Sequence, residues 1–88
     1  MERLSKEIRE FVARNFYLPD PAALRDDASL IDMGVIDSTG VLEVISYLEG
    51  HFDIVVEEEE TVPENLDSIT RIASFIDRKK RAAVPAAG

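Results

Sequence analysis

The sequence contains no cysteine and a single histidine, His51, among its 88 residues. Disulfides and cysteine-thiolate metal sites are therefore excluded, and a zinc site built on histidines is disfavoured. No apolar run approaches the roughly 20 residues that span a bilayer, and the first residues lack the hydrophobic segment of a signal peptide. We therefore expect a cytoplasmic protein that holds no metal and does not associate with membranes.

Positive charge is also scarce. Ten lysine and arginine residues stand against 18 acidic residues, which gives a formal net charge of −8. Phosphate backbones and anionic lipids repel such a chain, so nucleic acid and membrane surfaces are poor partners, whereas basic patches on other proteins are favourable ones. A domain this small buries only about 60–65% of the surface that its unfolded chain exposes, so a deep catalytic cleft is hard to build. We expect a monomer that is not an enzyme.

Hydrophobic periodicity predicts a first helix from about Arg3 to Asn15. Pro19 and Pro21 forbid its continuation. Its apolar stripe would consist of Leu4, Ile8, Phe11, Val12 and Asn15. The connection that follows, residues 16–37, contains more aliphatic residues than a polar loop needs. We expect this connection to pack over the core.

Short helical turns are expected in this connection near residues 22–25 and 29–32. Gly34 is expected to form a tight turn that returns Val35 and Ile36 to the core.

A second helix is expected from Asp37-Ser38 to about His51. At 100° per residue, its buried face would consist of Val41, Ile45, Leu48 and Phe52, flanked by Leu42 and Val44. Its opposite face would carry small, lightly charged residues, namely Thr39, Gly40, Glu43, Ser46, Tyr47 and Gly50.

The remaining segments complete an all-α four-helix bundle with a long first connection and a short third helix. Residues 53–56 are β-like in composition but isolated, so we expect an extended loop. The short third helix is expected at Pro63–Leu66. Asp67 or Ser68 would cap the last helix, whose apolar stripe is Ile69, Ile72, Ala73, Phe75 and Ile76. The domain would span residues 1–81, with a disordered tail at 82–88.

Taken alone, Asp37-Ser38 indicates only helix capping, because both side chains accept hydrogen bonds from the first free N–H groups of a helix. The wider stretch is more specific. Residues 27–38 contain an acidic residue, a leucine, a glycine and an aliphatic-Asp-Ser sequence, and residues 39–53 follow without a gap. This pattern resembles the acyl and peptidyl carrier proteins, and the resemblance covers roughly residues 4–80.

The resemblance implies that Ser38 carries a covalent 4'-phosphopantetheine arm derived from coenzyme A, and that Asp37 helps to dock the transferase. The arm's thiol holds acyl or aminoacyl cargo as a thioester. Implied partners are a phosphopantetheinyl transferase, a loading ligase or acyltransferase, and synthase or tailoring enzymes. The residues expected to meet these partners are Thr39, Glu43, Ser46, Tyr47 and Glu49.

Four positions on the second helix, Thr39, Gly40, Ser46 and Gly50, are smaller or more neutral than fatty-acid carriers usually present. This difference favours a dedicated pathway, such as polyketide or nonribosomal peptide synthesis, over housekeeping fatty-acid synthesis. Tyr47 is expected to narrow the space between helices, so we expect short or polar cargo.

Four alternative interpretations are considered. The chain could be a helical interaction module in which Ser38 is only a cap. A hydrolase lacks a base, because Ser38 and His51 lie roughly 20 Å apart on one helix. Tyr47 and His51 lie one helical turn apart and resemble an acid–base pair, but we expect both side chains to pack at the edge of the core. The run Glu57–Glu60 would form a solvated acidic loop or a weak Ca²⁺ or Mg²⁺ site.

Overall fold

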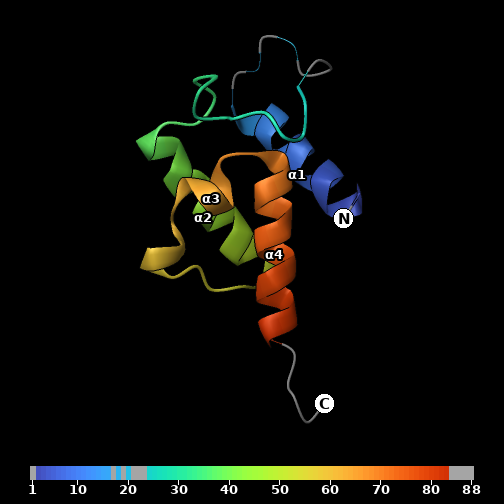
Figure 1. The fold of residues 1–88 in the computed structure, drawn as a ribbon, viewed down its shortest axis with the longest axis vertical. Coiled ribbons are helices and arrows are strands. Elements are labelled where there is room, and N and C mark those ends of the chain that lie inside the picture. The colour runs from blue at the N-terminus through green and yellow to red at the C-terminus, as the bar shows by residue number, and fades with distance from the viewer. Residues whose placement is uncertain (1, 17, 19, 21–23, 84–88) are drawn as a thin grey trace.

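The computed structural model describes residues 2–16, 18, 20 and 24–83 (Figure 1). These residues form four α-helices and one 3-10 helix and contain no strand, so the predicted all-α fold is confirmed. The elements are α1 (Glu2–Asn15), α2 (Ser38–Phe52), the 3-10 helix η2 (Glu58–Glu60), α3 (Pro63–Leu66) and α4 (Ile69–Ala83). No helix in this part of the chain is both long and apolar enough to cross a membrane.

Helix α4 runs along the longest axis of the molecule, and α1 and α3 pack against it (Figure 1). Helices α1 and α4 bury apolar stripes in one core, to which α3 adds Leu66. Helix α1 contributes Ile8 and Val12, whereas Asn15 of the predicted stripe is exposed and its side chain donates to the carbonyl of Phe11. Ile69, Ile72, Ala73, Phe75 and Ile76 of α4 are all buried, as predicted.

The connection between α1 and α2 packs over the core, as its aliphatic content predicts. Leu24, Leu30, Val35 and Ile36 are buried. The turn predicted near residues 29–32 is present, as hydrogen-bonded turns over residues 30–34. The turn predicted near residues 22–25 lies mostly outside the described residues, and the described pair at its end is not helical.

The buried face of α2 differs from the predicted one. Gly40, Val44, Leu48 and Phe52 are buried, whereas Leu42 is 64% exposed. Val41 and Ile45 are only partly buried against the core. The prediction that Gly40 lies on the exposed face is wrong, because a hydrophobic stripe is read from side chains and a glycine has none to read.

The segments around α3 follow the prediction more closely. Residues 53–56 are extended, and Ile54 is buried there. Ser68 caps α4, since its hydroxyl oxygen accepts from the N–H of Arg71 at 3.0 Å. Helix α4 reaches Ala83, two residues into the predicted tail, and the rest of that tail lies outside the described residues.

Candidate functional site

The start of α2 is organised by Asp37. One carboxylate oxygen of Asp37 accepts from the N–H of Gly40 at 2.7 Å, and its carbonyl accepts from the N–H of Val41 at 2.9 Å. Asp37 is therefore the N-cap, as predicted, and the next residue, Ser38, is not needed for capping. Ser38 is exposed, and its hydroxyl makes no hydrogen bond within the described part of the chain.

This environment fits a covalently attached phosphate. Ser38 is the first residue of a 15-residue helix, whose first turn contains no acidic side chain. The N-terminus of a helix carries partial positive charge and free N–H groups, and both favour an anion. A phosphodiester on Ser38 would leave the buried residues around it undisturbed.

The chain reaches Ser38 through a tight turn at Gly34. Gly34 has a φ of +73°, a backbone conformation that residues with a Cβ rarely adopt. The turn returns the chain to Leu30, whose carbonyl accepts from the N–H groups of Val35 at 2.9 Å and Ile36 at 3.2 Å. The prediction that this glycine returns the chain to the core is confirmed.

Asp67, which lies more than 30 residues later in the sequence, stabilises this turn. Its two carboxylate oxygens accept from the Ser29 hydroxyl at 2.7 Å and from the N–H of Ile31 at 2.9 Å. Its carbonyl accepts from the N–H of Leu30 at 2.7 Å. Sequence reasoning considered Asp67 only as a possible cap of α4, a role that belongs to Ser68. Asp67 instead joins the α3–α4 junction to the segment that leads to Ser38.

The predicted partner-facing residues lie on the outer side of α2. Thr39, Glu43 and Ser46 line an open groove, together with the exposed Leu42 and residues Phe11 and Asn15 at the end of α1. Glu49 is exposed on the same helix, but it also accepts from the N–H of Val56 at 2.9 Å and so anchors the extended loop. With Tyr47, four of the five predicted residues line this one groove, and Glu49 does not.

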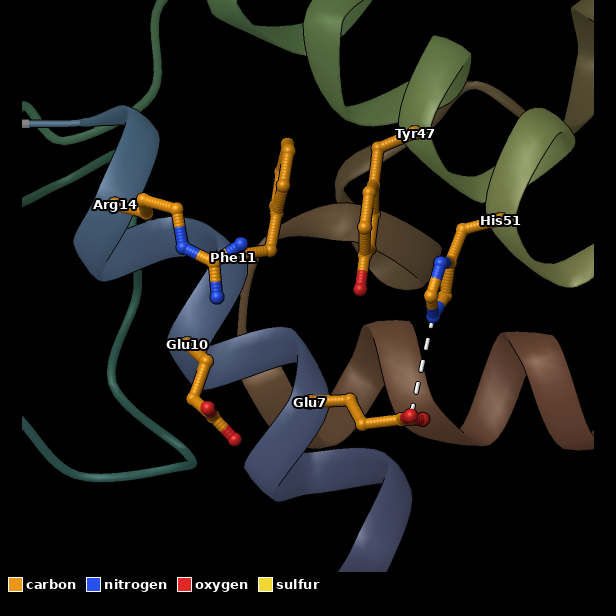
Figure 2. A pocket seen from close by; sticks show the side chains of 6 residues that line it. All are labelled: Glu7, Glu10, Phe11, Arg14, Tyr47 and His51. Atoms are coloured by element: carbon orange, nitrogen blue, oxygen red, sulfur yellow. Dashed lines mark ion pairs between the residues drawn. The ribbon is translucent and has the colours of Figure 1, made fainter.

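Tyr47, another of the predicted docking residues, also lines this groove. Its side chain extends from α2 toward α1 (Figure 2). Its ring is stacked on Phe11 at 3.8 Å and lies 5.0 Å from the ring of His51, whose Nε2 is 3.8 Å from a Glu7 oxygen. Burial raises the pKa of Tyr47, and the nearby Glu7 carboxylate raises it further. A neutral, half-buried phenol of this kind is suited to packing rather than to proton transfer.

A small apolar cavity, separate from this groove, lies beside the start of α2. It measures about 100 Å³ and is lined by Ile31, Ile36, Val41, Thr61, Val62, Pro63 and Leu66. Tyr47 does not line this cavity. Its ring instead packs against Phe11, between α1 and α2.

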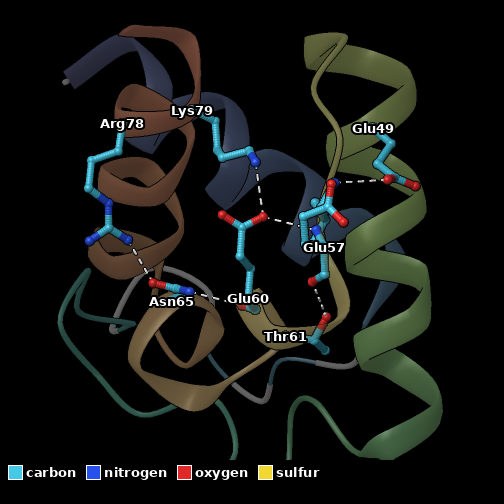
Figure 3. Close-up of polar contacts among 8 residues, drawn as sticks. Glu49, Glu57, Glu60, Thr61, Asn65, Arg78 and Lys79 are labelled. Carbon is cyan, nitrogen blue, oxygen red and sulfur yellow. Dashed lines mark hydrogen bonds and ion pairs between the residues drawn. The ribbon is translucent and has the colours of Figure 1, made fainter. Parts of the chain in front are cut away.

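The acidic run forms a bonded structure rather than a loop solvated throughout (Figure 3). The Glu60 carboxylate accepts from the N–H of Glu57 and from Lys79 of α4, both at 2.9 Å. The Asn65 side chain donates to the Glu60 carbonyl and accepts from Arg78. Among the described residues, no three acidic or histidine side chains are grouped in a way that would hold a metal ion.

The bonds of Glu60 predict a pH-dependent contribution to stability. The hydrogen bond from the Glu57 N–H lowers the pKa of Glu60, and Lys79 lowers it further. A lowered folded-state pKa stabilises the protein above the unfolded value of about 4.3 and loses that effect as the pH falls through the folded value. We expect Glu60→Gln to destabilise at pH 7 and to show a smaller deficit at pH 3, measured by urea unfolding. Glu59→Gln, at an exposed glutamate, is the control; an equal deficit at both pH values would contradict the ionic role.

Comparisons with known proteins agree with the resemblance. A family model described as a phosphopantetheine attachment site matches residues 6–76. The chain is 28% identical to an acyl carrier protein of Brachyspira hyodysenteriae over 78 residues, which are 89% of this chain and 97% of that protein. It is 30% identical to an acyl carrier protein of Bdellovibrio bacteriovorus over 63 residues, 72% and 78% of the two chains. It is 38% identical to a D-alanyl carrier protein of Streptococcus mutans over 56 residues, 64% and 71% of the two chains.

Proposed function

The chain belongs to the phosphopantetheine-attachment family of carrier proteins, and from this premise we propose that Ser38 is the residue that carries the arm. Members of the family are carriers rather than catalysts, and their 4'-phosphopantetheine is attached covalently. The observation that supports Ser38 is its exposed, unbonded hydroxyl at the N-terminus of α2, next to the capping Asp37.

In the attachment reaction, Ser38 Oγ attacks the coenzyme A phosphorus that bears the pantetheine. A new P–O bond forms to the serine, the bond from that phosphorus to the bridging oxygen breaks, and adenosine bisphosphate leaves. The hydroxyl proton passes to a base of the transferase, since no histidine of this chain is close to Ser38: His51 is 13 residues away, roughly 20 Å along the same helix. When bound, the arm supplies a thiol that holds cargo as a thioester, which explains how a chain without cysteine takes part in thiol chemistry.

Intact mass tests this proposal directly. The protein is incubated with coenzyme A, Mg²⁺ and a broad-specificity phosphopantetheinyl transferase. We expect one phosphopantetheinyl adduct per chain, located on the peptide that contains Ser38. A chain that gains no adduct would support the alternative of a helical interaction module in which this serine is a structural residue only.

The outer side of α2 is the proposed docking surface for the transferase and for loading and synthase enzymes. Glu43 lies exposed in its groove, and a surplus of negative charge attracts basic partner surfaces. Glu58 is equally exposed but lies in η2. The two glutamates therefore form a matched pair, because replacing either by lysine changes the net charge equally.

We expect Glu43→Lys to slow arm attachment more than Glu58→Lys does. Exposed charges interact within a Debye length of about 8 Å at 0.15 M salt, so the difference should shrink as salt is added. The measurement is the initial rate of attachment at several NaCl concentrations. Equal rates for the two variants would show that only net charge matters and that docking occurs elsewhere.

We further propose that the cargo is short or polar, an aminoacyl or substituted malonyl-type unit in a dedicated pathway such as polyketide or nonribosomal peptide synthesis. The apolar cavity beside the start of α2 supports this, because it measures only about 100 Å³. The similarity to a D-alanyl carrier protein also supports an aminoacyl cargo. Burial of a long acyl chain requires space that the cavity does not offer.

NMR of the loaded protein tests the cargo proposal. With an acyl chain of about eight carbons, where each buried CH₂ is worth about 0.8 kcal/mol, sequestration would shift the amide signals of Val41, Val62 and Leu66. We expect shifts confined to the residues around Ser38 for both short and long chains. Large shifts of the cavity residues with the long chain alone would favour a fatty-acid carrier instead.

A further inference from the structure

Gly40, two residues after Ser38, is buried although it lies in the first turn of α2. A Cβ built on its backbone would lie 2.9 Å from Phe16 Cε1 and 3.3 Å from the Asp37 carboxylate oxygen that caps the helix. The ring of Phe16 therefore packs directly on the backbone of this turn. Separations below 3.0 Å are essentially never seen for a real Cβ, so a side chain at position 40 must displace one of these neighbours.

Phe16 has little freedom to move away. It follows α1 directly, its N–H donates to the carbonyl of Val12 at 2.9 Å, and its ring meets that of Phe11 edge to face at 6.0 Å. Because Phe11 is in turn stacked on Tyr47, the ring is backed by packed aromatic side chains that join α1 to α2. The other neighbour, the Asp37 carboxylate, can yield only by weakening its hydrogen bond to the N–H of Gly40.

We infer that Gly40 and Phe16 are positioning residues for arm attachment, an inference that rests on Ser38 being the attachment residue. The absence of a side chain at position 40 lets the end of α1 brace the first turn of α2 and keeps the Asp37 cap closed. Together, these contacts hold the backbone of Ser38, and with it the Cα–Cβ bond from which the hydroxyl extends. The glycine is thus required by packing beneath the helix, and not by the surface that partners contact.

Gly50 provides a matched control on the same helix. A Cβ at Gly50 would meet nothing within 4 Å. On helix propensity alone, either glycine-to-alanine change should stabilise the protein, raising Tm by about 2–8 °C for a domain of this size. We expect Gly50→Ala to show that rise and to accept the arm at the wild-type rate. Gly40→Ala should show no rise.

The decisive measurement is steady-state attachment by the transferase, well below the Tm of every variant. We expect Gly40→Ala to lower kcat by at least about tenfold with KM nearly unchanged, because a reacting group misplaced by about 1 Å costs up to about a hundredfold in rate while the docking surface is intact. The double variant Gly40→Ala/Phe16→Leu lacks the ring atom that the new methyl group meets. We expect its kcat to return close to that of Phe16→Leu alone.

Each outcome is informative. If wild type itself gains no adduct, the assignment of Ser38 fails and the inference fails with it. If wild type is modified and Gly40→Ala is modified as fast as Gly50→Ala, the attachment residue stands and the positioning role is wrong. A loss in Gly40→Ala that appears only in KM, or that the Phe16→Leu change does not relieve, would place Gly40 in the docking surface instead.

Discussion

Ser38→Ala is expected to gain no phosphopantetheinyl mass under conditions in which wild type is fully converted, and to remain folded. The chemical loss is complete because the nucleophilic oxygen is removed. The structural loss is small because Asp37, and not Ser38, caps α2. The exposed Ser38 hydroxyl has no bond to lose, so the free energy of unfolding should change by no more than about 0.5 kcal/mol.

Intact mass and urea unfolding of the same samples check both parts of this expectation. Ser74→Ala is the control, since Ser74 is a partly exposed serine of α4, outside the proposed docking surface, and this variant should be modified normally. An adduct on Ser38→Ala would place the arm on another residue. Unfolding of Ser38→Ala would show that this serine supports the start of the helix.

The largest expected loss of stability among polar substitutions comes from Asp67→Ala. This change removes the acceptor for the Ser29 hydroxyl and for the N–H of Ile31. Hydrogen bonds to charged groups contribute about 1.5–3 kcal/mol each, and Asp67 is partly exposed, so we expect a loss of about 2–4 kcal/mol in the free energy of unfolding. The turn before Ser38 should also loosen, and its amides should lose protection against hydrogen exchange.

Asp77→Ala is the control, because it also removes an aspartate carboxylate but leaves the bonds to the connection between α1 and α2 intact. Within the described residues, Asp77 forms an ion pair with Arg81, one turn along α4, and such pairs are worth about 0.3–0.5 kcal/mol. Ser29→Ala removes one of the two Asp67 bonds and should fall between the two variants. If Asp67→Ala were no less stable than Asp77→Ala, the bonds to the connection would contribute nothing to folding.

Local sequence chemistry predicts the immediate surroundings of Ser38 well. An aspartate before a helix caps it, a glycine allows a left-handed turn, and aliphatic residues beyond that turn return to the core. These rules correctly predicted the roles of Asp37, Gly34, Val35 and Ile36, because each role depends on neighbours within a few residues.

The features that the sequence did not predict depend on distant partners. The side chain of Asp67 accepts hydrogen bonds from Ile31 and Ser29, which precede it in the sequence by 36 and 38 positions. No local pattern distinguishes this use of an aspartate from helix capping. Gly40 is buried because Phe16 lies over it, although periodicity places it on the exposed face. The stacking of Tyr47 on Phe11 joins two helices and is likewise set by a partner distant in the sequence. Tertiary contacts therefore determine the details of this site.

The bonds of Asp67 also set the order in which the molecule can mature during synthesis. The segment before Ser38 is hydrogen-bonded to Asp67, which the ribosome adds 29 positions after Ser38. The N–H of Thr70 also donates to the carbonyl of Asp26. At roughly 5–20 residues per second, residues 39–67 take about 1.5–6 s to translate. A nascent chain therefore exposes Ser38 before it can hold the serine in place. Because Ser38 is the proposed attachment residue, we expect efficient modification only after the second half of the domain has emerged.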